Sequence, residues 1–280
     1  MAGIQVVTDS ACDLSPSMAE ALGVRVVPLA IRFGKEELID RDELSIKEFW
    51  DRVITGPDMP ETAAPSPGAF RQAYLDAAEA GCDGVICITL SSGLSATFQA
   101  ACTAATDLPV AMPVRVVDSL TVTMGEGLLA MAACDMAKDG RSLDDIVTEI
   151  ESQRARTHVY GVLESLDYLK KGGRIGGAAH LVGSLLSIKP VIEVRDGVVE
   201  VESKQRTRSR ALQYLASKAL QAGRLERLAV ANGVARDIDE LLSLLESARP
   251  EHEMIVSDLG PVIGAHAGPG TVGVCFQLAP

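Results

Sequence analysis

Aromatic side chains are scarce in this 280-residue chain: they make up 4% of the sequence, and only one is tryptophan. Because nucleic-acid bases stack on aromatic rings, such a chain offers few stacking platforms. Positive charge is also in deficit, since the formal net charge is −12. Nucleic acids and anionic membranes both attract positively charged proteins. We therefore expect no nucleic-acid partner and at most transient contact with a membrane.

The sequence also lacks long hydrophobic runs. Its longest uncharged stretch, residues 259–280, is interrupted by five glycines and three prolines, so it does not predict a membrane helix. The first residues, Met1-Ala2-Gly3, lead directly into a strand-like run and do not form a signal peptide. These features predict a cytoplasmic protein.

The cysteines do not form a metal-binding or redox pattern. None of the six belongs to a C-x-x-C motif, and no histidine lies at a ligand spacing from any of them. Most lie in apolar surroundings, as Cys87 does between Ile86 and Ile88. We predict that they are small core residues in a reducing compartment, and that the protein holds no metal and no cofactor.

Strands and helices alternate in the first half of the chain. Apolar runs predict strands at residues 4–8, 24–33, 83–90 and 114–117, and helical composition follows at 96–105, 128–138 and 142–156. Such alternation is typical of a mostly parallel sheet covered on both faces. We predict an α/β protein whose N-terminal domain spans residues 1–157.

The second half has a different pattern. Asp196-Gly197 lies between two apolar runs and predicts a two-residue hairpin turn. Further strands are expected at 228–232, 254–258 and 271–278, with helices at 178–186, 209–222 and 237–248. Hairpins mixed with helices indicate an α+β domain, which we place at residues 158–280.

Polar residues follow three of the predicted strands. Thr8-Asp9-Ser10, Ser91-Ser92-Gly93 and Asp118-Ser119 all come at strand ends, where parallel sheets collect their ligands. After Ser91-Ser92-Gly93-Leu94-Ser95 a helix begins, and its free N–H groups beside hydroxyls favour an anion. Ordinary helix capping by serine explains the same residues.

Two further loops contain candidate ligand groups. Thr62 precedes Pro65, Pro67 and Gly68 in a segment that predicts a stiff loop, although an ordinary linker has the same composition. His266 lies among glycines and a proline, where the backbone can approach a ligand. Its imidazole can donate a hydrogen bond to a carboxylate, and a purely structural role fits equally well.

Basic residues gather at 170–174, which includes Arg174, and at 204–210, which includes Arg206. Such arginines can dock an acidic partner or a phosphate group, whereas a solvated surface is the commoner explanation for one cluster alone.

The main alternative is an enzyme that acts on a small phosphorylated or carboxylated metabolite, with His266 as acid/base and Ser92 as anion anchor. No pair of titratable groups with opposite roles stands out beside His266, so we predict no catalytic residue. A G-x-G-x-x-A pattern at residues 125–130 does not directly follow a predicted strand, which argues against a dinucleotide site. A scaffold module without ligand is a third interpretation.

Several of these segments, in this order, resemble the DegV family across nearly the whole chain. The matching pieces are Val7-Thr8-Asp9-Ser10, Thr62 with Pro65-Ser66-Pro67-Gly68, Ser91-Ser92-Gly93-Leu94-Ser95-Ala96-Thr97-Phe98, Asp118-Ser119, Gly172-Gly173-Arg174-Ile175, Lys189-Pro190-Val191, Lys204 with Arg206, and His266 with Gly268-Pro269-Gly270-Thr271. The chain departs from the family pattern at Ala63, where serine is common, and at Ala96, where glycine is common.

The resemblance implies a protein that binds a long-chain fatty acid between two domains without performing chemistry itself. It implies that Thr62, Ser92 and the Gly93 N–H hold the carboxylate, with Ser91 and His266 close by. It also implies that the bound acid is presented to a dihydroxyacetone-kinase-like fatty acid kinase subunit, which forms an acyl phosphate. Arg174 and Arg206 match basic positions expected to handle an anion or to dock the kinase.

Overall fold

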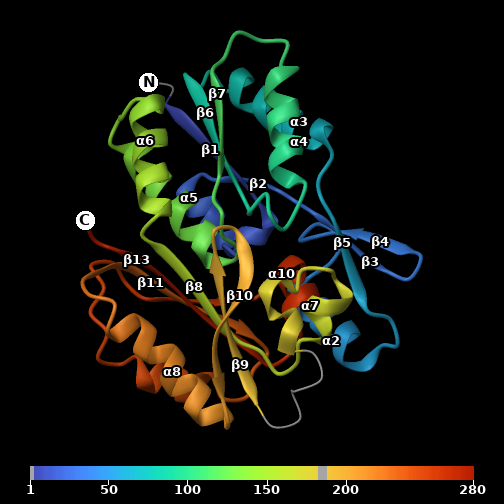
Figure 1. Ribbon diagram of the computed structural model, residues 1–280. Coiled ribbons are helices and arrows are strands. Elements are labelled where there is room, and N and C mark those ends of the chain that lie inside the picture. Colours follow the sequence, from blue (N-terminus) through green and yellow to red (C-terminus); the bar gives the residue numbers. More distant parts are fainter. Residues whose placement is uncertain (1–2, 182–187) are drawn as a thin grey trace.

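A computed structural model describes residues 3–181 and 188–280 as three β-sheets with helices packed around them (Figure 1). The strands are β1 (Ile4–Asp9), β2 (Arg25–Val27), β3 (Ala30–Phe33), β4 (Glu36–Ile39), β5 (Pro60–Ala63), β6 (Gly84–Thr89), β7 (Val114–Asp118), β8 (Thr157–Val162), β9 (Lys189–Arg195), β10 (Val198–Gln205), β11 (Leu225–Gly233), β12 (Ile255–Asp258) and β13 (Thr271–Leu278). A parallel sheet has the order β2-β1-β6-β7, and a small antiparallel sheet the order β4-β3-β5. The third sheet, β10-β9-β8-β13-β11-β12, is mixed because only β11 and β12 run parallel.

Several of the helices begin at a residue whose side chain caps their first N–H groups. They are α1 (Pro16–Leu22), α2 (Ile46–Thr55), α3 (Pro67–Glu79), α4 (Thr97–Thr106), α5 (Met124–Lys138), α6 (Leu143–Arg154), α7 (Asp167–Lys171), α8 (Arg208–Leu220), α9 (Ile238–Leu244) and α10 (Pro261–Ala267), with 3-10 turns at Ser10–Cys12 and Gly176–Leu181. Ser15, Ser45, Ser66 and Ser142 each accept a hydrogen bond from the N–H three residues further on, the arrangement that favours serine at a helix start.

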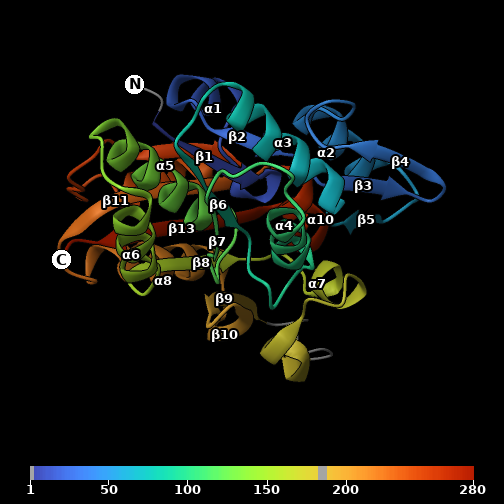
Figure 2. The same ribbon diagram turned by 90° about the horizontal axis from the view of Figure 1, so that it is seen from above.

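Helices cover both faces of the parallel sheet, as the sequence predicts. Side chains alternate along β1 and β6, so Val7 packs with α3 and α4 while Val6 packs with α5. Figure 2 shows the parallel sheet lying between these helix layers. The prediction of an α/β fold with a parallel N-terminal sheet is therefore confirmed.

Helix α5 lies between the parallel sheet and the six-stranded sheet. Its Leu128 and Leu129 belong to the same hydrophobic core as Ile86 of β6 and Ala229 of β11. A helix buried on several sides is apolar around most of its circumference, which fits the composition of α5. Helices α8 and α9 cover the other face of the six-stranded sheet. The two halves thus share one core; the six-stranded sheet begins at Thr157, while the division into domains at 157 stays a prediction.

The predicted strand at 24–33 is wrong as a single element. It forms β2 and β3, which belong to different sheets. Pro28 lies between them and has no N–H to continue a ladder. The break carries the chain from the parallel sheet to the small antiparallel one.

Two other local predictions also differ from the structure. Thr62 lies in strand β5 rather than in a loop, and His266 lies in helix α10 rather than in a glycine loop. Of the helix predicted at 178–186, residues 178–181 form part of a 3-10 turn, and the remainder lies outside the described residues. The hairpin at Asp196-Gly197 is confirmed: both residues have positive φ, 50° and 79°, as a tight primed turn requires.

Buried carboxyl groups gather where β1 ends. Asp9 accepts hydrogen bonds from the N–H of Leu90 at 2.9 Å and of Ala11 at 3.0 Å, and Glu126 accepts one from the Thr8 hydroxyl at 2.7 Å. Burial raises the pKa of Asp9 to about 7. Burial, and then the nearby charge of Asp9, raises the pKa of Glu126 well above its ordinary value. Burial and the neighbouring Asp9 charge therefore both favour the uncharged form of Glu126 in the folded protein.

Asp13 is a third buried acid in the same region. Its carboxylate accepts hydrogen bonds from the Gly260 N–H at 2.9 Å and from the Thr123 hydroxyl at 2.6 Å. Burial raises its pKa to about 7, although both hydrogen bonds and the nearby Arg41 guanidinium oppose that shift.

Within the described residues, no helix is long and apolar enough to span a bilayer.

We predict that Glu126→Gln makes the free energy of unfolding less dependent on pH. The folded protein holds protons on these acids that the unfolded chain releases above about pH 4. The contribution of Glu126 is thus complete below about pH 4 and is lost as pH rises through its raised folded-state pKa. Glutamine cannot ionise, so the stability of the variant should fall less than that of the native chain between pH 5 and pH 8. Urea unfolding at pH 5, 7 and 8 measures this, and identical pH profiles for both proteins would contradict it.

Candidate functional site

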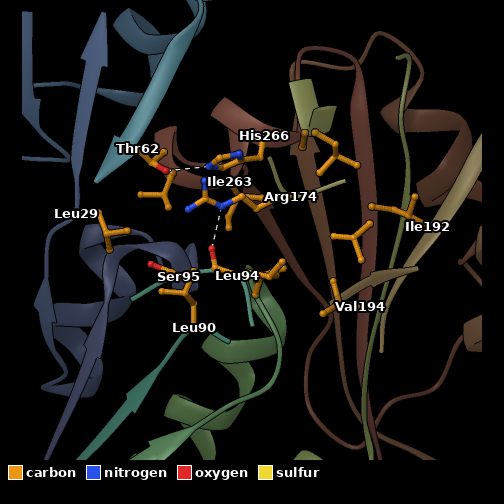
Figure 3. Close-up of a pocket in the computed structure, with 15 residues that line it drawn as sticks. Leu29, Thr62, Leu90, Leu94, Ser95, Arg174, Ile192, Val194, Ile263 and His266 are labelled. Carbon is orange, nitrogen blue, oxygen red and sulfur yellow. Dashed lines mark hydrogen bonds between the residues drawn. The ribbon is translucent and has the colours of Figure 1, made fainter. Parts of the chain in front are cut away.

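A largely apolar cavity lies between the parallel sheet and the β9–β10 hairpin (Figure 3). Its lining comes from segments far apart in the sequence: Leu29, Thr62, Leu90, Leu94, Ser95, Val122, Leu169, Arg174, Ile192, Val194, Val199, Val262, Ile263, His266 and Ala267. The cavity volume is about 90 Å³. Ligand pockets typically have roughly 300–1,000 Å³, so a long ligand requires some lining side chains to move.

The polar side chains of the lining are Thr62, Ser95, Arg174 and His266, which we call the polar corner. Thr62 Oγ1 lies 2.9 Å from His266 Nε2, within hydrogen-bond distance. The Arg174 guanidinium donates to the backbone oxygens of Leu94 at 3.0 Å and Gly172 at 2.7 Å. Figure 3 shows Arg174 between His266 and Leu94. Four separate elements thus bring two hydroxyls, an imidazole and a guanidinium together.

Small residues make room for the histidine. A Cβ atom on Gly172 would lie 2.2 Å from His266 Nδ1, so only glycine fits there. Gly264, on the same helix as His266, leaves space for Phe49 and Trp50 of α2, which a Cβ would approach to 2.6 and 2.9 Å. Gly172 therefore leaves the space that His266 occupies, and Gly173, with φ of 70°, allows the turn.

The polar corner carries positive charge from Arg174 rather than from His266. Burial, reinforced by the Arg174 charge, lowers the pKa of His266 to about 4. The imidazole is therefore neutral at pH 7, and its Nδ1 has no hydrogen-bond partner among the described residues. No Asp or Glu lies in the described lining. A site with hydroxyl donors, one cation and no carboxylate favours binding of an anion.

The structure brings together part of the predicted site. Thr62 and His266 lie in the polar corner, and so does Arg174, which was predicted to dock a partner or a phosphate. Arg206 is exposed and lies outside the lining. The roles assigned to these four residues stay predictions.

The Ser91-Ser92-Gly93 motif lies beside the cavity rather than in its lining. Ser91 is buried, and its hydroxyl donates to the Gly197 backbone oxygen at 2.7 Å. The Gly93 N–H donates to Ser91 Oγ at 3.1 Å. Ser92 is exposed, and its N–H donates to Asp118 Oδ1 at 3.1 Å. Carboxylate binding by these three residues is likewise a prediction that the structure leaves open.

Ser95 is the polar lining residue that the sequence analysis named only as part of a motif and gave no role at the site. Its hydroxyl lies 2.8 Å from Thr97 Oγ1, just before the first turn of α4. The available signal was its place as the last hydroxyl in the loop between β6 and α4, where helix N–H groups favour an anion.

The described residues contain no group of three or more His, Cys, Asp or Glu side chains that could hold a metal ion. All six cysteines are free of disulfides, and four of them are buried, as expected for core residues: Cys12, Cys87, Cys134 and Cys275.

The architecture is that of an α/β protein with three sheets that encloses an apolar cavity with one cationic corner. A family model described as an uncharacterised protein of the DegV family matches residues 3–279. A DegV domain-containing protein of Streptomyces coelicolor is 36% identical over 285 residues, which cover 97% of each chain. The chain therefore belongs to the DegV family, as its motifs indicate.

Solved structures of relatives have the same fold. A DegV family protein from Thermus thermophilus, reported for its fatty acid binding, matches with a TM-score of 0.90 at 34% identity, over 99% of this chain and 100% of that chain. DegV from Bacillus subtilis, described as a fatty acid binding protein, matches with a TM-score of 0.89 at 30% identity over 100% of both chains.

We predict that the His266 imidazole stays neutral from pH 8 down to about pH 5 in the ligand-free protein, and gains a proton only near pH 4. Arg174→Gln should raise the pKa of His266, because the guanidinium charge opposes protonation. It should not restore an ordinary value, since burial is the larger cause. NMR titration of the imidazole resonances tests both statements. Titration of His266 near pH 6.5 in the native protein would refute them.

Proposed function

We propose that this protein binds a long-chain fatty acid in the cavity, with its carboxylate at the polar corner. The observation that carries the proposal is the cavity itself: an apolar lining that ends in Thr62, Ser95, Arg174 and His266. Relatives with the same fold are described as fatty acid binding proteins. The chemistry of the lining and the family agree on one class of ligand.

The energetics of the lining favour a long acyl chain. Each methylene group removed from water contributes about 0.8 kcal/mol, so most of the affinity comes from the tail. The polar corner supplies orientation: Arg174 attracts the carboxylate, and the Thr62 and Ser95 hydroxyls can donate to it. Neutral His266 can share a proton with Thr62 and adjust its hydrogen bonds to a carboxylate without adding charge.

Binding is better supported than catalysis by His266. A general acid/base works best with a pKa near the operating pH, and burial lowers the pKa of His266 to about 4. The described lining also contains no carboxylate that could orient the imidazole or stabilise its protonated form. The protein is therefore proposed to be a non-catalytic subunit that holds a substrate.

We predict that Ser95→Ala and Thr62→Val each weaken fatty acid binding by roughly ten- to a hundredfold. A hydrogen bond to a charged group contributes about 1.5–3 kcal/mol. Ser152→Ala is the matched control, because Ser152 is exposed on α6 and lies outside the lining. It should change the affinity for oleic acid less than Ser95→Ala does, as measured by calorimetry.

Denaturing extraction of the purified native protein should release a fatty acid. Failure to extract any lipid and to take up added oleic acid would end the proposal.

The bound carboxylate is proposed to be presented to a fatty acid kinase subunit, which would form an acyl phosphate. Lys204, Arg206 and Arg210 are exposed and lie at the start of α8 or just before it. On a chain of net charge −12 they offer a local positive surface for an acidic partner or a phosphate.

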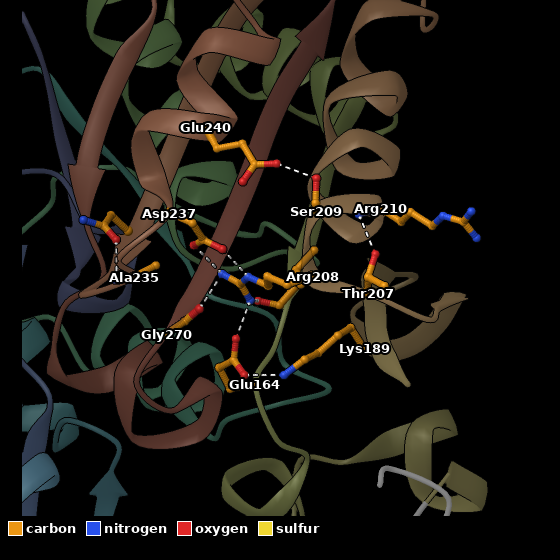
Figure 4. A network of polar contacts seen from close by, with 12 residues as sticks. Glu164, Lys189, Thr207, Arg208, Ser209, Arg210, Ala235, Asp237, Glu240 and Gly270 are labelled. Atoms are coloured by element: carbon orange, nitrogen blue, oxygen red, sulfur yellow. Dashed lines mark hydrogen bonds and ion pairs between the residues drawn. The ribbon is translucent and has the colours of Figure 1, made fainter. Parts of the chain in front are cut away.

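Arg208, which the sequence groups with these residues, has a different role. Its guanidinium forms a bidentate ion pair with the Asp237 carboxylate, with N–O distances of 2.7 and 3.0 Å (Figure 4). It also donates a hydrogen bond to the Gly270 backbone oxygen at 2.7 Å. Glu164 lies 3.2 Å away. Arg208 thus fixes the loop that follows α10, and the surface proposed for the partner is formed by its exposed neighbours.

We predict that Arg206→Ala leaves oleic acid affinity within about threefold but lowers the rate of acyl-phosphate formation with ATP and a dihydroxyacetone-kinase-like fatty acid kinase. An exposed charge acts mainly on encounter and orientation, so added salt should shrink the difference. Arg115→Ala is the control, because it removes one exposed positive charge from the opposite half of the chain. Loss of lipid affinity with normal phosphorylation of the remaining complex would place Arg206 at the ligand instead.

A further inference from the structure

The turn of the β9–β10 hairpin is attached to the loop that follows β6. Ser91, which is 0% exposed, donates its hydroxyl hydrogen to the Gly197 backbone oxygen at 2.7 Å. The same oxygen atom of Ser91 accepts a hydrogen bond from the Gly93 N–H at 3.1 Å. Figure 1 shows the hairpin reaching up to the loops that follow β6 and β7. One buried hydroxyl therefore links the six-stranded sheet to the parallel sheet.

Two glycines make this attachment close. A Cβ on Gly93 would lie 2.7 Å from the Gly197 oxygen, and a Cβ on Gly197 would lie 2.5 Å from Ser91 Oγ and 3.1 Å from Leu120. Gly197 also has φ of 79°, which other residues adopt only with strain. A side chain at either position that is not bonded to the facing segment would push the hairpin away from the loop.

The hairpin is also a wall of the cavity. Ile192, Val194 and Val199 line the cavity from β9 and β10. Leu94 and Ser95 line it from the opposite side, only a few residues beyond Ser91 on the same loop. The contact between Ser91 and Gly197 thus holds together two sides of the space proposed for the acyl chain.

Within the six-stranded sheet the hairpin turn is held by the ladder between β9 and β10, and the 3-10 turn at Gly176–Leu181 packs beside Val199 of β10. β10 is an edge strand of the six-stranded sheet, with β9 as its neighbour. A turn at the end of an edge hairpin can separate from its contacts without breaking the ladder between β9 and β8. Separation there would cost the buried hydrogen bond and would part Val194 and Val199 from Leu94.

We propose that Ser91 and Gly93 are positioning residues that hold the β9–β10 hairpin as a wall of the cavity and so control how fast a lipid enters and leaves. The inference rests on the proposed binding of a fatty acid in this cavity. It gives the first and third residues of the Ser-Ser-Gly motif a role distinct from carboxylate binding.

The first test compares the exchange kinetics of two variants. Ser91→Ala removes the link, and Thr89→Val removes a buried hydroxyl at the end of β6, two residues before Ser91, that has no partner among the described residues. The probe is cis-parinaric acid, a fluorescent fatty acid, displaced by excess oleic acid in a stopped-flow instrument. Ser91→Ala should raise both the association and the dissociation rate about three- to tenfold and leave Kd within about twofold, whereas Thr89→Val should change neither rate.

Kinetics separate this role from direct contact with the ligand. A residue that binds the carboxylate would change the dissociation rate and Kd together, as expected for Ser95→Ala. A Ser91→Ala protein that shows this second pattern, or exchanges lipid at the rate of Thr89→Val, overturns the positioning role. A native protein that binds neither cis-parinaric acid nor oleic acid overturns the proposed function itself.

A disulfide tests the same contact without relying on the stability of the alanine variant. The approach of Gly197 to Ser91 Oγ places Ser91→Cys and Gly197→Cys within the reach of a disulfide. The oxidised double variant should exchange cis-parinaric acid at least tenfold more slowly than the same protein after reduction. Both states share every side chain, so backbone strain at residue 197 cancels in the comparison. Equal rates before and after reduction would overturn the proposal.

Discussion

The Asp13 carboxylate is the junction on which the arrangement of the two halves depends. It accepts hydrogen bonds from the Gly260 N–H, at the start of α10, and from the Thr123 hydroxyl, at the start of α5. The backbone oxygen of Asp13 also accepts a hydrogen bond from the Ser257 hydroxyl at 2.6 Å. A buried carboxyl group is costly unless hydrogen-bonded, so these contacts fix α10, and with it His266, relative to the parallel sheet. The position of the imidazole is therefore set by a residue that does not line the cavity.

The polar corner and the apolar lining divide the work of recognition. The apolar side chains come from loops that follow strands of the parallel sheet, from β9 and β10, and from α7 and α10. They contribute non-directional hydrophobic contact area. Direction comes from hydrogen-bonding groups, one from each of four segments, and from the single charge of Arg174. The His266 imidazole is neutral and lies close to Thr62, so it adds no second positive charge beside Arg174. Because burying each additional charge costs free energy, one cation is easier to place next to apolar groups than two.

Local signals predicted most of the elements, whereas side-chain roles depended on tertiary contacts. The hairpin at Asp196-Gly197 and the helix after Ser142 were predictable because turns and caps are chosen by the residues that form them. The helical position of His266 was hidden because α10 is short and rich in small residues that pack against α2. Ser92 and Ser95 belong to the same loop, and which of them lines the cavity depends on how that loop packs in the folded protein.

The cavity is complete only when both halves of the chain are folded against each other, since Leu90 directly follows β6 of the parallel sheet and Ile192 lies in β9 of the six-stranded sheet. A ligand in such a cavity binds the native state and not the unfolded chain, so mass action makes it part of the folding equilibrium. At a free concentration one hundred times Kd, a ligand adds about 2.7 kcal/mol to stability. Loaded molecules would then survive proteolytic turnover longer than empty ones, and the abundance of the protein in a cell would follow the supply of its ligand.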